Sequence, residues 1–349
     1  MNELLVYSLK SSIMLALLYL PYVLMLRREH FFRLNRLMLL GILSLALVLP
    51  AWRYSYSVPA GEAGTALVAA QQLVGGGAEP ADAPAWTVWR LLALLNIIGM
   101  AGMMAFRACQ LLRIRRAIRG GSLWRQRQAG GTTVYCHAAD EPSFSWMHSI
   151  VVGQRDYAEH RREVLLHEQA HICCRHSHDI LLLAVVEIVQ WWNPLVYRVG
   201  ESLRNVHEYE ADSLVLQQGI DMGAYQQLLL QKVLAGTKLP FANHFNRNSV
   251  VKRIAMMRRP PSSPWARGKA LYVLPLTAFA LVVSATPIIE PVLIIDGREV
   301  SREQMEQILP DSISHVDVLK GASATTFFGV KGQGGAVIVS TKKHNPQQP

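Results

Sequence analysis

Two histidines and a glutamate in one short segment have the spacing of a zinc hydrolase site. His167, Glu168 and His171 form the pattern H-E-x-x-H. On a helix, residues four apart leave the same face about one turn apart, so both imidazoles can reach one metal ion. A tetrahedral Zn²⁺ held in this way keeps positions for a third protein ligand and a water. Glu168 would lie beside that water, where it can accept a proton and pass it to the leaving amine of a peptide.

A third ligand is available further along the chain. Glu208 and Asp212 are four residues apart, so on a helix they share one face. We expect Glu208 to be the third ligand and Asp212 to orient a ligand histidine through a hydrogen bond. Glu210 competes for the ligand role, but it points to a different face of the helix. His207 can also ligate, although a solvent-facing role or a hydrogen bond behind the ligands is favoured.

The pentapeptide alone also arises by chance on polar helix faces. Here the preceding residues, 164–166, are Val-Leu-Leu, which makes the flanking helix apolar and favours a buried site. A second group of potential ligands crowds one short stretch without a matching pair elsewhere, so we expect packing or surface roles for its members: Cys173, Cys174, His176 and His178.

The composition indicates a membrane protein. Hydrophobic residues make up 51% of the chain and charged residues only 17%, with a mean hydropathy of +0.18. Four apolar runs are candidates for membrane helices. They divide the chain into three spans within 1–106 (about 4–26, 37–51 and 86–106), a peptidase region at 107–268, a fourth span at 269–287, and a module at 288–349.

The net charge of +10 is unevenly placed. No acidic residue occurs from 83 to 139, whereas seven arginines follow the third apolar run. The positive-inside rule then puts the 27–36 loop and the 107–268 region on the cytosolic side of the membrane, and the N-terminus, the 51–85 loop and the tail on the outside. All four cysteines fall on the reducing side or at its boundary. A basic stretch without a nucleic-acid-reading fold predicts contact with the lipid bilayer and no direct nucleic-acid binding.

The segment 180–199 is also apolar, but Glu187, Gln190 and Asn193-Pro194 interrupt it. If it crossed the membrane, His167 and Glu208 would lie on opposite faces and could not share one ion. We therefore predict a buried or membrane-dipping helix, broken near Asn193-Pro194, and four spans rather than five.

The order of these features resembles the BlaR/MecR-type membrane metallopeptidases, which are antibiotic-sensing signal transducers. The resemblance covers about 1–287 and rests on the H-E-x-x-H pattern and on three further segments, 192–196, 207–212 and 250–257. It implies a multi-span α-helical membrane protein with a mainly α-helical, gluzincin-like cytosolic peptidase domain. It also implies Zn²⁺ held by His167, His171 and Glu208, Glu168 as the base, and a protein substrate, often a transcriptional repressor or the protease itself, cut after an external signal.

The tail departs from the antibiotic sensors, because only about 60 residues follow Pro287. Two S-x-x-K matches, at 249–252 and 340–343, lie inside the cell and at the end of the chain, so β-lactam acylation is not expected. The tail instead resembles the plug domain of TonB-dependent receptors at 291–297, 315–324 and 335–343. Three strands and a helix near 301–309 predict a small α/β module.

Three functions are compatible with these features. In the leading one, the protein is a signal-transducing zinc endopeptidase of the inner membrane, with a ligand or a periplasmic protein partner at its tail. The alternatives are a housekeeping membrane protease with the same site, and a non-catalytic receptor or scaffold that uses the plug-like tail.

Overall fold

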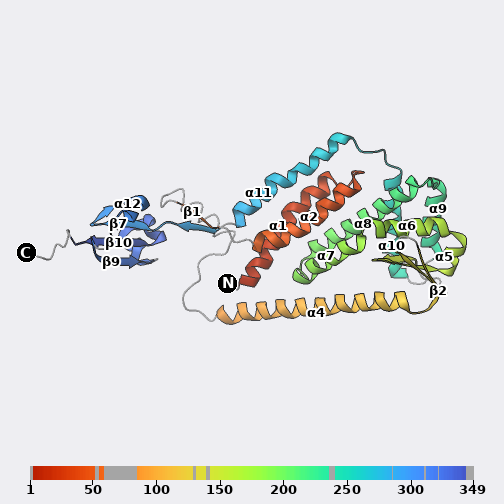
Figure 1. The fold of residues 1–349 in the computed structure, drawn as a ribbon, viewed down its shortest axis with the longest axis horizontal. Helices are drawn as coiled ribbons and strands as arrows, with labels where there is room; N and C mark the ends of the chain where they lie inside the picture. The colour runs from red at the N-terminus through yellow and green to blue at the C-terminus, as the bar shows by residue number, and fades with distance from the viewer. Residues whose placement is uncertain are drawn as a thin grey trace, which may run out of the picture. The chain divides into compact units, whose positions relative to one another are not determined.

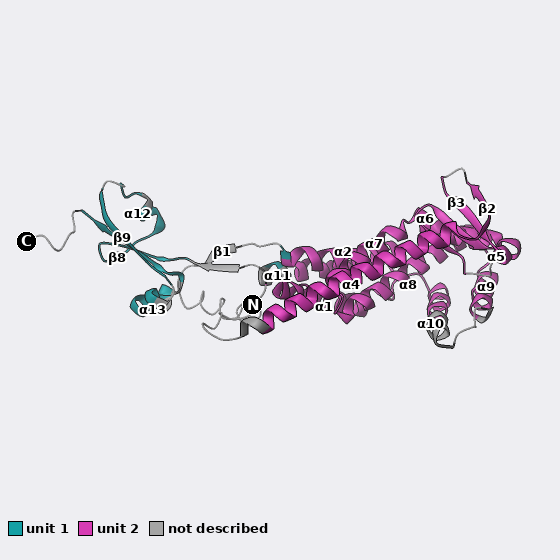
Figure 2. Ribbon diagram, turned by 90° about the horizontal axis from the view of Figure 1, so that it is seen from below, with its two compact units in different colours: residues 1, 51–83, 279–349 teal, residues 2–50, 84–278 magenta. Residues whose placement is uncertain are grey.

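The computed structural model describes residues 3–51, 55–58, 85–128, 131–138, 142–235, 240–284, 286–309, 312–320 and 322–342. They belong to two compact units, one of residues 2–50 and 84–278 and one of residues 1, 51–83 and 279–349 (Figures 1 and 2). Most of the predicted external loop, 51–85, lies outside the described residues.

Three helices of the larger unit are long and apolar enough to cross a membrane: α1 (Glu3–Met25), α2 (Phe32–Ala51) and α4 (Ala85–Arg119). They contain the runs expected at 4–26, 37–51 and 86–106, except that α1 ends one residue earlier, at Met25. Helix α4 continues well past its apolar run, because the arginines that follow are good helix formers. It ends at Gly120-Gly121, where Gly121 adopts a positive φ of 78°.

The run expected as a fourth span, 269–287, is built differently. Pro264–Tyr272 form a 3₁₀ helix, η1, and the α-helix that follows, α11 (Val273–Ser284), has 12 residues. A membrane crossing needs about 20 residues of α-helix. The fourth span therefore stays a prediction, while Tyr272 ties η1 to α1 by donating to the Leu18 carbonyl at 3.1 Å.

Helices α7 (His176–Val189) and α8 (Pro194–Gln217) form a hairpin in the region expected to hold a broken helix. Asn193 caps α8, since its side chain accepts a hydrogen bond from the Leu195 amide at 2.9 Å and Pro194 occupies the first turn. The break therefore has a local cause that can be read in the sequence.

The hairpin lies alongside α1 (Figure 1). At its turn, Trp192 Nε1 donates to Ser8 Oγ at 3.0 Å, and Gln190 donates to Ser11. Further along α8, the Tyr19 hydroxyl and Ser202 Oγ are 2.8 Å apart. Polar side chains of an otherwise apolar helix thus fasten the hairpin along most of the length of α1.

A four-stranded sheet follows α4, in the order β2-β3-β5-β4. Strands β3 (Thr133–His137) and β5 (Ser149–Gly153) pair in parallel, and they occur where the sequence at 132–136 and 149–152 predicts short strands. The sheet also contains β2 (Ser122–Arg127) and β4 (Phe144–Trp146), which the sequence pattern did not indicate. The helices that complete this unit are α5 (Gln154–Glu159), α6 (Arg161–Cys173), α9 (Met222–Ala235) and α10 (Pro240–Met257).

Residue Val164 seats α6 on the sheet. It is buried in one cluster with Val134, Cys136, Ile150 and Val152, which come from the paired strands β3 and β5. Burying such side chains stabilises the contact by about 1.5–3 kcal/mol each. The sheet therefore fixes the position of the helix that carries the H-E-x-x-H pattern.

The smaller unit contains a second sheet, ordered β8-β7-β10-β9, and a parallel pair of β1 (Ser55–Val58) and β6 (Thr286–Ile289). Strands occur in all three expected segments: β7 (Val292–Ile295), β9 (Ile313–Leu319) and β10 (Ala336–Thr341). The expected helix is α12 (Arg302–Glu306), and the remaining elements are β8 (Arg298–Glu299), α13 (Ala322–Phe328) and η3 (Gly329–Gly334). Asp296-Gly297, both at positive φ, form the two-residue turn between β7 and β8.

Gly99 on α4 provides a test of this packing, because a Cβ built there lies 2.1 Å from the ring of Trp191 at the hairpin turn. Gly99→Ala should lower the free energy of unfolding by about 1–3 kcal/mol, since the rigid indole must move. Gly102→Ala on the same helix meets nothing within 4 Å and is the matched control. Thermal unfolding of the purified protein in detergent measures both. Equal stability of the two variants would disprove the contact.

Candidate metal centre

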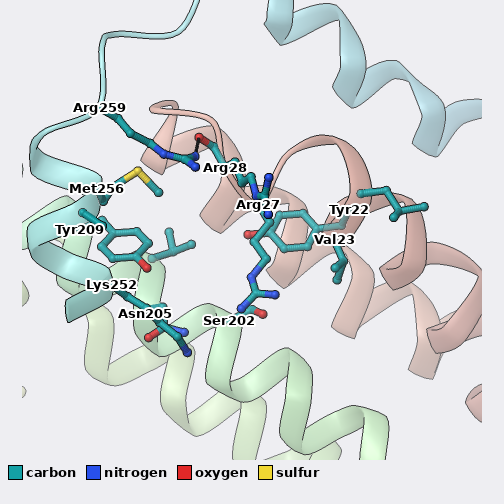
Figure 3. Close-up of a pocket in the computed structure, with 13 residues that line it drawn as sticks. Tyr22, Val23, Arg27, Arg28, Ser202, Asn205, Tyr209, Lys252, Met256 and Arg259 are labelled. Atoms are coloured by element: carbon teal, nitrogen blue, oxygen red, sulfur yellow. Dashed lines mark hydrogen bonds between the residues drawn. The ribbon is translucent and has the colours of Figure 1, made fainter. Parts of the chain in front are cut away.

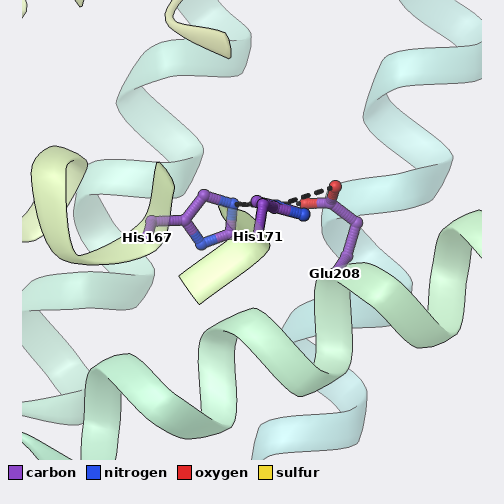
Figure 4. Close-up of side chains that lie close together, drawn as sticks. All are labelled: His167, His171 and Glu208. Atoms are coloured by element: carbon purple, nitrogen blue, oxygen red, sulfur yellow. Dashed lines mark hydrogen bonds and ion pairs between the residues drawn. The ribbon is translucent and has the colours of Figure 1, made fainter. Parts of the chain in front are cut away.

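Three potential ligand atoms from α6 and α8 converge at one point (Figure 4). The Nε2 atoms of His167 and His171 are 3.2 Å apart. The Glu208 carboxylate oxygens lie 3.5 Å from His167 Nε2 and 3.6 Å from His171 Nε2. Bonds of about 2.0–2.1 Å in a tetrahedron separate ligand atoms by roughly 3.3 Å. The three side chains that the sequence indicated as ligands therefore have the spacing that one tetrahedral metal ion requires.

The protonation of these groups also favours a cation. Burial lowers the pKa of His167, but hydrogen bonds to Asp212 and Glu208 outweigh it and raise this pKa to about 9. Burial and the neighbouring His167 together lower the pKa of His171 to about 3. The Glu208 carboxylate is thus paired with positive charge on His167, and a metal ion at this point would replace the His167 Nε2 proton as the partner of that carboxylate.

His167 is held from behind by Tyr225 and Asp212. The Tyr225 hydroxyl lies 3.0 Å from His167 Nδ1 and donates to Asp212 Oδ1 at 2.9 Å. Asp212 Oδ1 itself is 3.4 Å from the same Nδ1. An Nδ1–H directed at the tyrosine oxygen leaves the Nε2 lone pair free for a metal. The structure thus places Asp212 beside a candidate ligand, with Tyr225 of α9 as an additional partner that the sequence did not indicate.

His171 has a different set of partners. Its Nδ1 lies 2.8 Å from His176 Nδ1, and His176 Nε2 lies 3.1 Å from Glu210 Oε2. Glu210 can accept a hydrogen bond from His176 Nε2, and His176 Nδ1 can accept one from His171 Nδ1. In this arrangement the proton of His171 is on Nδ1, so the Nε2 lone pair faces the other candidate ligands. Glu210, the competitor for the third ligand position, therefore contacts the chain of groups behind His171. Its helix face differs from that of Glu208, as expected.

His207 is buried and does not face solvent, so that part of the expectation was wrong. Its Nε2 lies 2.7 Å from Asp179 Oδ2, and its ring stacks on His176 with centroids 4.0 Å apart. The stacked pair fixes the plane of His176 and so supports its contact with His171. Local sequence could not indicate this pairing, because Asp179 comes from α7.

The second group of potential ligands is only partly assembled. Cys174 and His176 come together with Glu210, all within 4.8 Å, while Cys173 and His178 lie outside this cluster. Arg36 already contacts Glu210, with Nη1 3.5 Å from Oε2. Burial raises the pKa of the Cys174 thiol to about 11, which keeps it neutral. A neutral thiol next to a paired carboxylate suits a supporting role better than metal binding.

Arg253 of α10 neutralises the carboxylates on the other side of the centre. Its Nη1 lies 2.9 Å from Glu208 Oε2, and its Nε donates to Asp212 Oδ2 at 2.8 Å. Although burial opposes ionisation, Arg253 and His167 hold the pKa of Glu208 far below its ordinary value. One signal was available in the sequence, since Arg253 is a lone cation on a helix face that otherwise carries Val250, Ile254 and Met257.

Glu168 is buried beside the candidate ligands and faces β4. Burial raises the pKa of this carboxyl, while His167 and a hydrogen bond from Ser145 act against the shift. A carboxylate with a raised pKa is closer to the value at which a base both accepts and releases a proton near neutrality. Its position is therefore compatible with the role expected from the sequence.

The partners of His171 can be tested through metal affinity. His176→Gln should weaken zinc binding by about 10–100-fold, because His171 loses the group that orients its ring. His178→Gln, an exposed histidine of the same helix, should leave affinity unchanged. Competition with a chromophoric chelator on the purified protein measures both dissociation constants. Indistinguishable values for the two variants would exclude a positioning role for His176.

A family model described as BlaR1 peptidase M56 matches residues 47–257. The match covers more than half of the chain and includes α4, the four-stranded sheet and every side chain of the centre that comes from α6 to α9. No curated protein matches the chain.

Proposed function

The chain belongs to the BlaR1 peptidase M56 family, a family of membrane-associated metallopeptidases, and on that premise we propose that it is a zinc-dependent endopeptidase. The observation that carries the proposal is the convergence of His167, His171 and Glu208 at the separations of a tetrahedral site. The expected gluzincin-like domain, with ligands from two separate helices, belongs to the same proposal.

A zinc ion held by these ligands would polarise the scissile carbonyl and acidify a bound water. Glu168 is buried next to His167, where its carboxylate would hold a proton during the reaction and pass it to the leaving amine. Tyr225 and His176 hold the two ligand imidazoles from behind, at 3.0 and 2.8 Å. In this proposal His167, His171 and Glu208 bind the metal, Glu168 transfers protons, and Tyr225 and His176 orient the ligand histidines.

The substrate side of the centre is β4. This strand lies at the edge of its sheet and packs against α6, and Ser145 on it bonds to Glu168. An exposed strand edge can pair with an extended peptide through main-chain hydrogen bonds. We therefore expect an extended segment of a protein, such as a cytosolic regulator or the chain itself, to be cut here.

A path from the membrane region to the centre supports a transducing role. Arg36, in the first turns of α2, donates to Asp179 Oδ2 at 2.6 Å and contacts Glu210. Glu210 bonds to His176, which in turn bonds to His171. A shift of α2 would therefore reach a candidate metal ligand through packed, hydrogen-bonded groups.

The predicted topology completes the proposal. It has four spans in the inner membrane, the hairpin of α7 and α8 dipping into the bilayer, the peptidase region in the cytosol and the tail in the periplasm. The basic residues at 107–127 support this orientation. The sheet of β7 to β10 supports a small module that docks or senses at the tail, and the plug-like resemblance belongs to this part of the proposal.

Replacement of the proposed base tests catalysis directly. Glu168→Gln should abolish cleavage while zinc content stays near that of the wild type, because no ligand is lost. Glu163→Gln on the same helix is the control and should retain both. Zinc is measured by elemental analysis, and cleavage by mass spectrometry of candidate substrates. Retained cleavage in Glu168→Gln would refute the mechanism.

The inactive variant also distinguishes the biological roles. Crosslinking in cells that express Glu168→Gln should capture the substrate. A single regulator, or the chain itself, fits a transducer. A broad set of unrelated membrane proteins fits the housekeeping alternative.

The path through α2 predicts unequal effects of two arginines that contact the same carboxylate. Arg36→Gln should lower the free energy of unfolding by about 3–5 kcal/mol, because it leaves buried carboxylates without their cation. Arg33→Gln should cost under about 1 kcal/mol, since Arg33 is 84% exposed and lies 3.6 Å from Glu210 Oε1. Zinc affinity should fall only in Arg36→Gln. Chemical unfolding and chelator competition test both, and parallel behaviour of the variants would rule out the path.

A further inference from the structure

A cavity of about 570 Å³ lies between the end of α1, the middle of α8 and the end of α10 (Figure 3). None of the three candidate ligands lines it. It opens where α1 ends at Met25 and the connection to α2 begins, and its walls lie entirely in the larger unit. The cavity is thus a feature of the peptidase region that the proposed chemistry does not use.

Positive charge dominates the walls, which carry Arg27, Arg28, Lys252 and Arg259. Within the described residues, Lys252 is the cation among these that pairs with a carboxylate, at 2.7 Å from Glu201 Oε1. Arg259 Nη1 donates to the backbone carbonyl of Arg28 at 3.1 Å. No ion pair is formed by the side chains of Arg27 or Arg28 in the part of the chain that the structure describes. Arg27 also acts on the Glu201 carboxylate from a distance, but four cations on the walls against this one carboxylate leave an excess of positive charge, which favours an anionic ligand.

Tyr22 gives a second, independent indication of a ligand. It is 0% exposed, and its hydroxyl has no hydrogen-bond partner among the described residues. Figure 3 shows its ring beside Arg27 on the cavity wall. A buried hydroxyl without a partner costs free energy, so a hydrogen-bond acceptor in the cavity would stabilise it. The wall therefore offers a neutral donor next to two arginines that form no ion pair among the described residues.

We propose that this cavity binds the phosphate-bearing headgroup of an anionic membrane phospholipid. Arginine guanidinium groups match phosphate oxygens in charge and geometry, and the Tyr22 hydroxyl supplies one further donor. The cavity lies at the end of a candidate membrane helix, which is the depth of lipid headgroups. Its rim includes Leu24, an apolar side chain that is 74% exposed and can contact acyl chains. The volume lies within the range of small-ligand sites.

The bound headgroup would hold two helices that also build the metal centre. Tyr209 on the cavity wall is next in sequence to Glu208 on α8, and Lys252 is next to Arg253 on α10. An anion between α1 and these helices would therefore fix the spacing of the elements that carry a candidate ligand and its partner cation. The binding itself does not depend on peptidase activity.

Native mass spectrometry of the full-length protein in detergent tests the proposal. Phosphatidylglycerol should bind more tightly than zwitterionic phosphatidylcholine. Arg27→Gln combined with Arg28→Gln should weaken phosphatidylglycerol binding by roughly tenfold or more, because each removes a charge-assisted contact. Tyr22→Phe, which removes only the hydroxyl, should weaken it by about two- to tenfold. The control, Arg155→Gln with Arg162→Gln, removes the same charge from exposed positions outside the arginine-rich stretch of residues 107–127 and should bind like the wild type.

Several results would overturn the proposal. Equal binding of the two lipids would exclude a site for an anionic headgroup. Equal losses in the two double variants would show attraction by general surface charge. Inorganic phosphate that displaces the lipid at micromolar concentration would show a soluble phosphate site instead. A thermal midpoint of Tyr22→Phe equal to that of the wild type, together with weaker lipid binding, would support a direct contact.

Discussion

The candidate metal centre depends on neutralising four carboxylates that contact its two histidines or the histidines behind them. Glu208 and Asp212 lie on one side and Asp179 and Glu210 on the other, and all four come from the α7–α8 hairpin. Removing such charges from water costs several kcal/mol each, and a partner cation offsets this only with good geometry. Each pair of carboxylates is neutralised by one buried arginine. Arg253 contacts Glu208 and Asp212, and Arg36 contacts Asp179 and Glu210.

The two arginines come from elements far apart in the chain, α2 and α10, and this explains much of the architecture. The hairpin must lie against α2 to receive Arg36, and α10 must return to α8 to deliver Arg253. The bonds between the hairpin and α1 place it in the first of these positions. Asp212 also contacts His167, and Glu210 contacts His176, which bonds to His171. The same contacts therefore neutralise the carboxylates and orient the candidate ligands.

The parts of the site that were predictable from the sequence depend on local geometry. The four-residue spacing of His167 and His171, and that of Glu208 and Asp212, survives in any helix. The break at Asn193-Pro194 likewise follows from a cap and a proline. The roles of Tyr225, Arg253 and Arg36, and the contact of His176 with His171, were not identified, because they exist only when distant helices pack together. The solvent-facing alternative for His207 was wrong for the same reason, since its partner Asp179 belongs to another helix. Strand β2 was missed because an edge strand of polar residues has no hydrophobic alternation.

The arginines of the 27–36 loop show how one composition signal can conceal different physical roles. In the sequence they simply favour a cytosolic loop, because the positive-inside rule counts charges without regard to contacts. In the structure, Arg36 is mostly buried between the carboxylates of Asp179 and Glu210, behind the candidate metal centre. Arg33 reaches the same glutamate from solvent. Arg27 and Arg28, by contrast, line a cavity and form no ion pair among the described residues. Four arginines within ten residues therefore have two different roles. Some neutralise acidic side chains of the protein, and others remain available to bind an external anion. The packing of α1, α2 and α8 determines the role of each arginine.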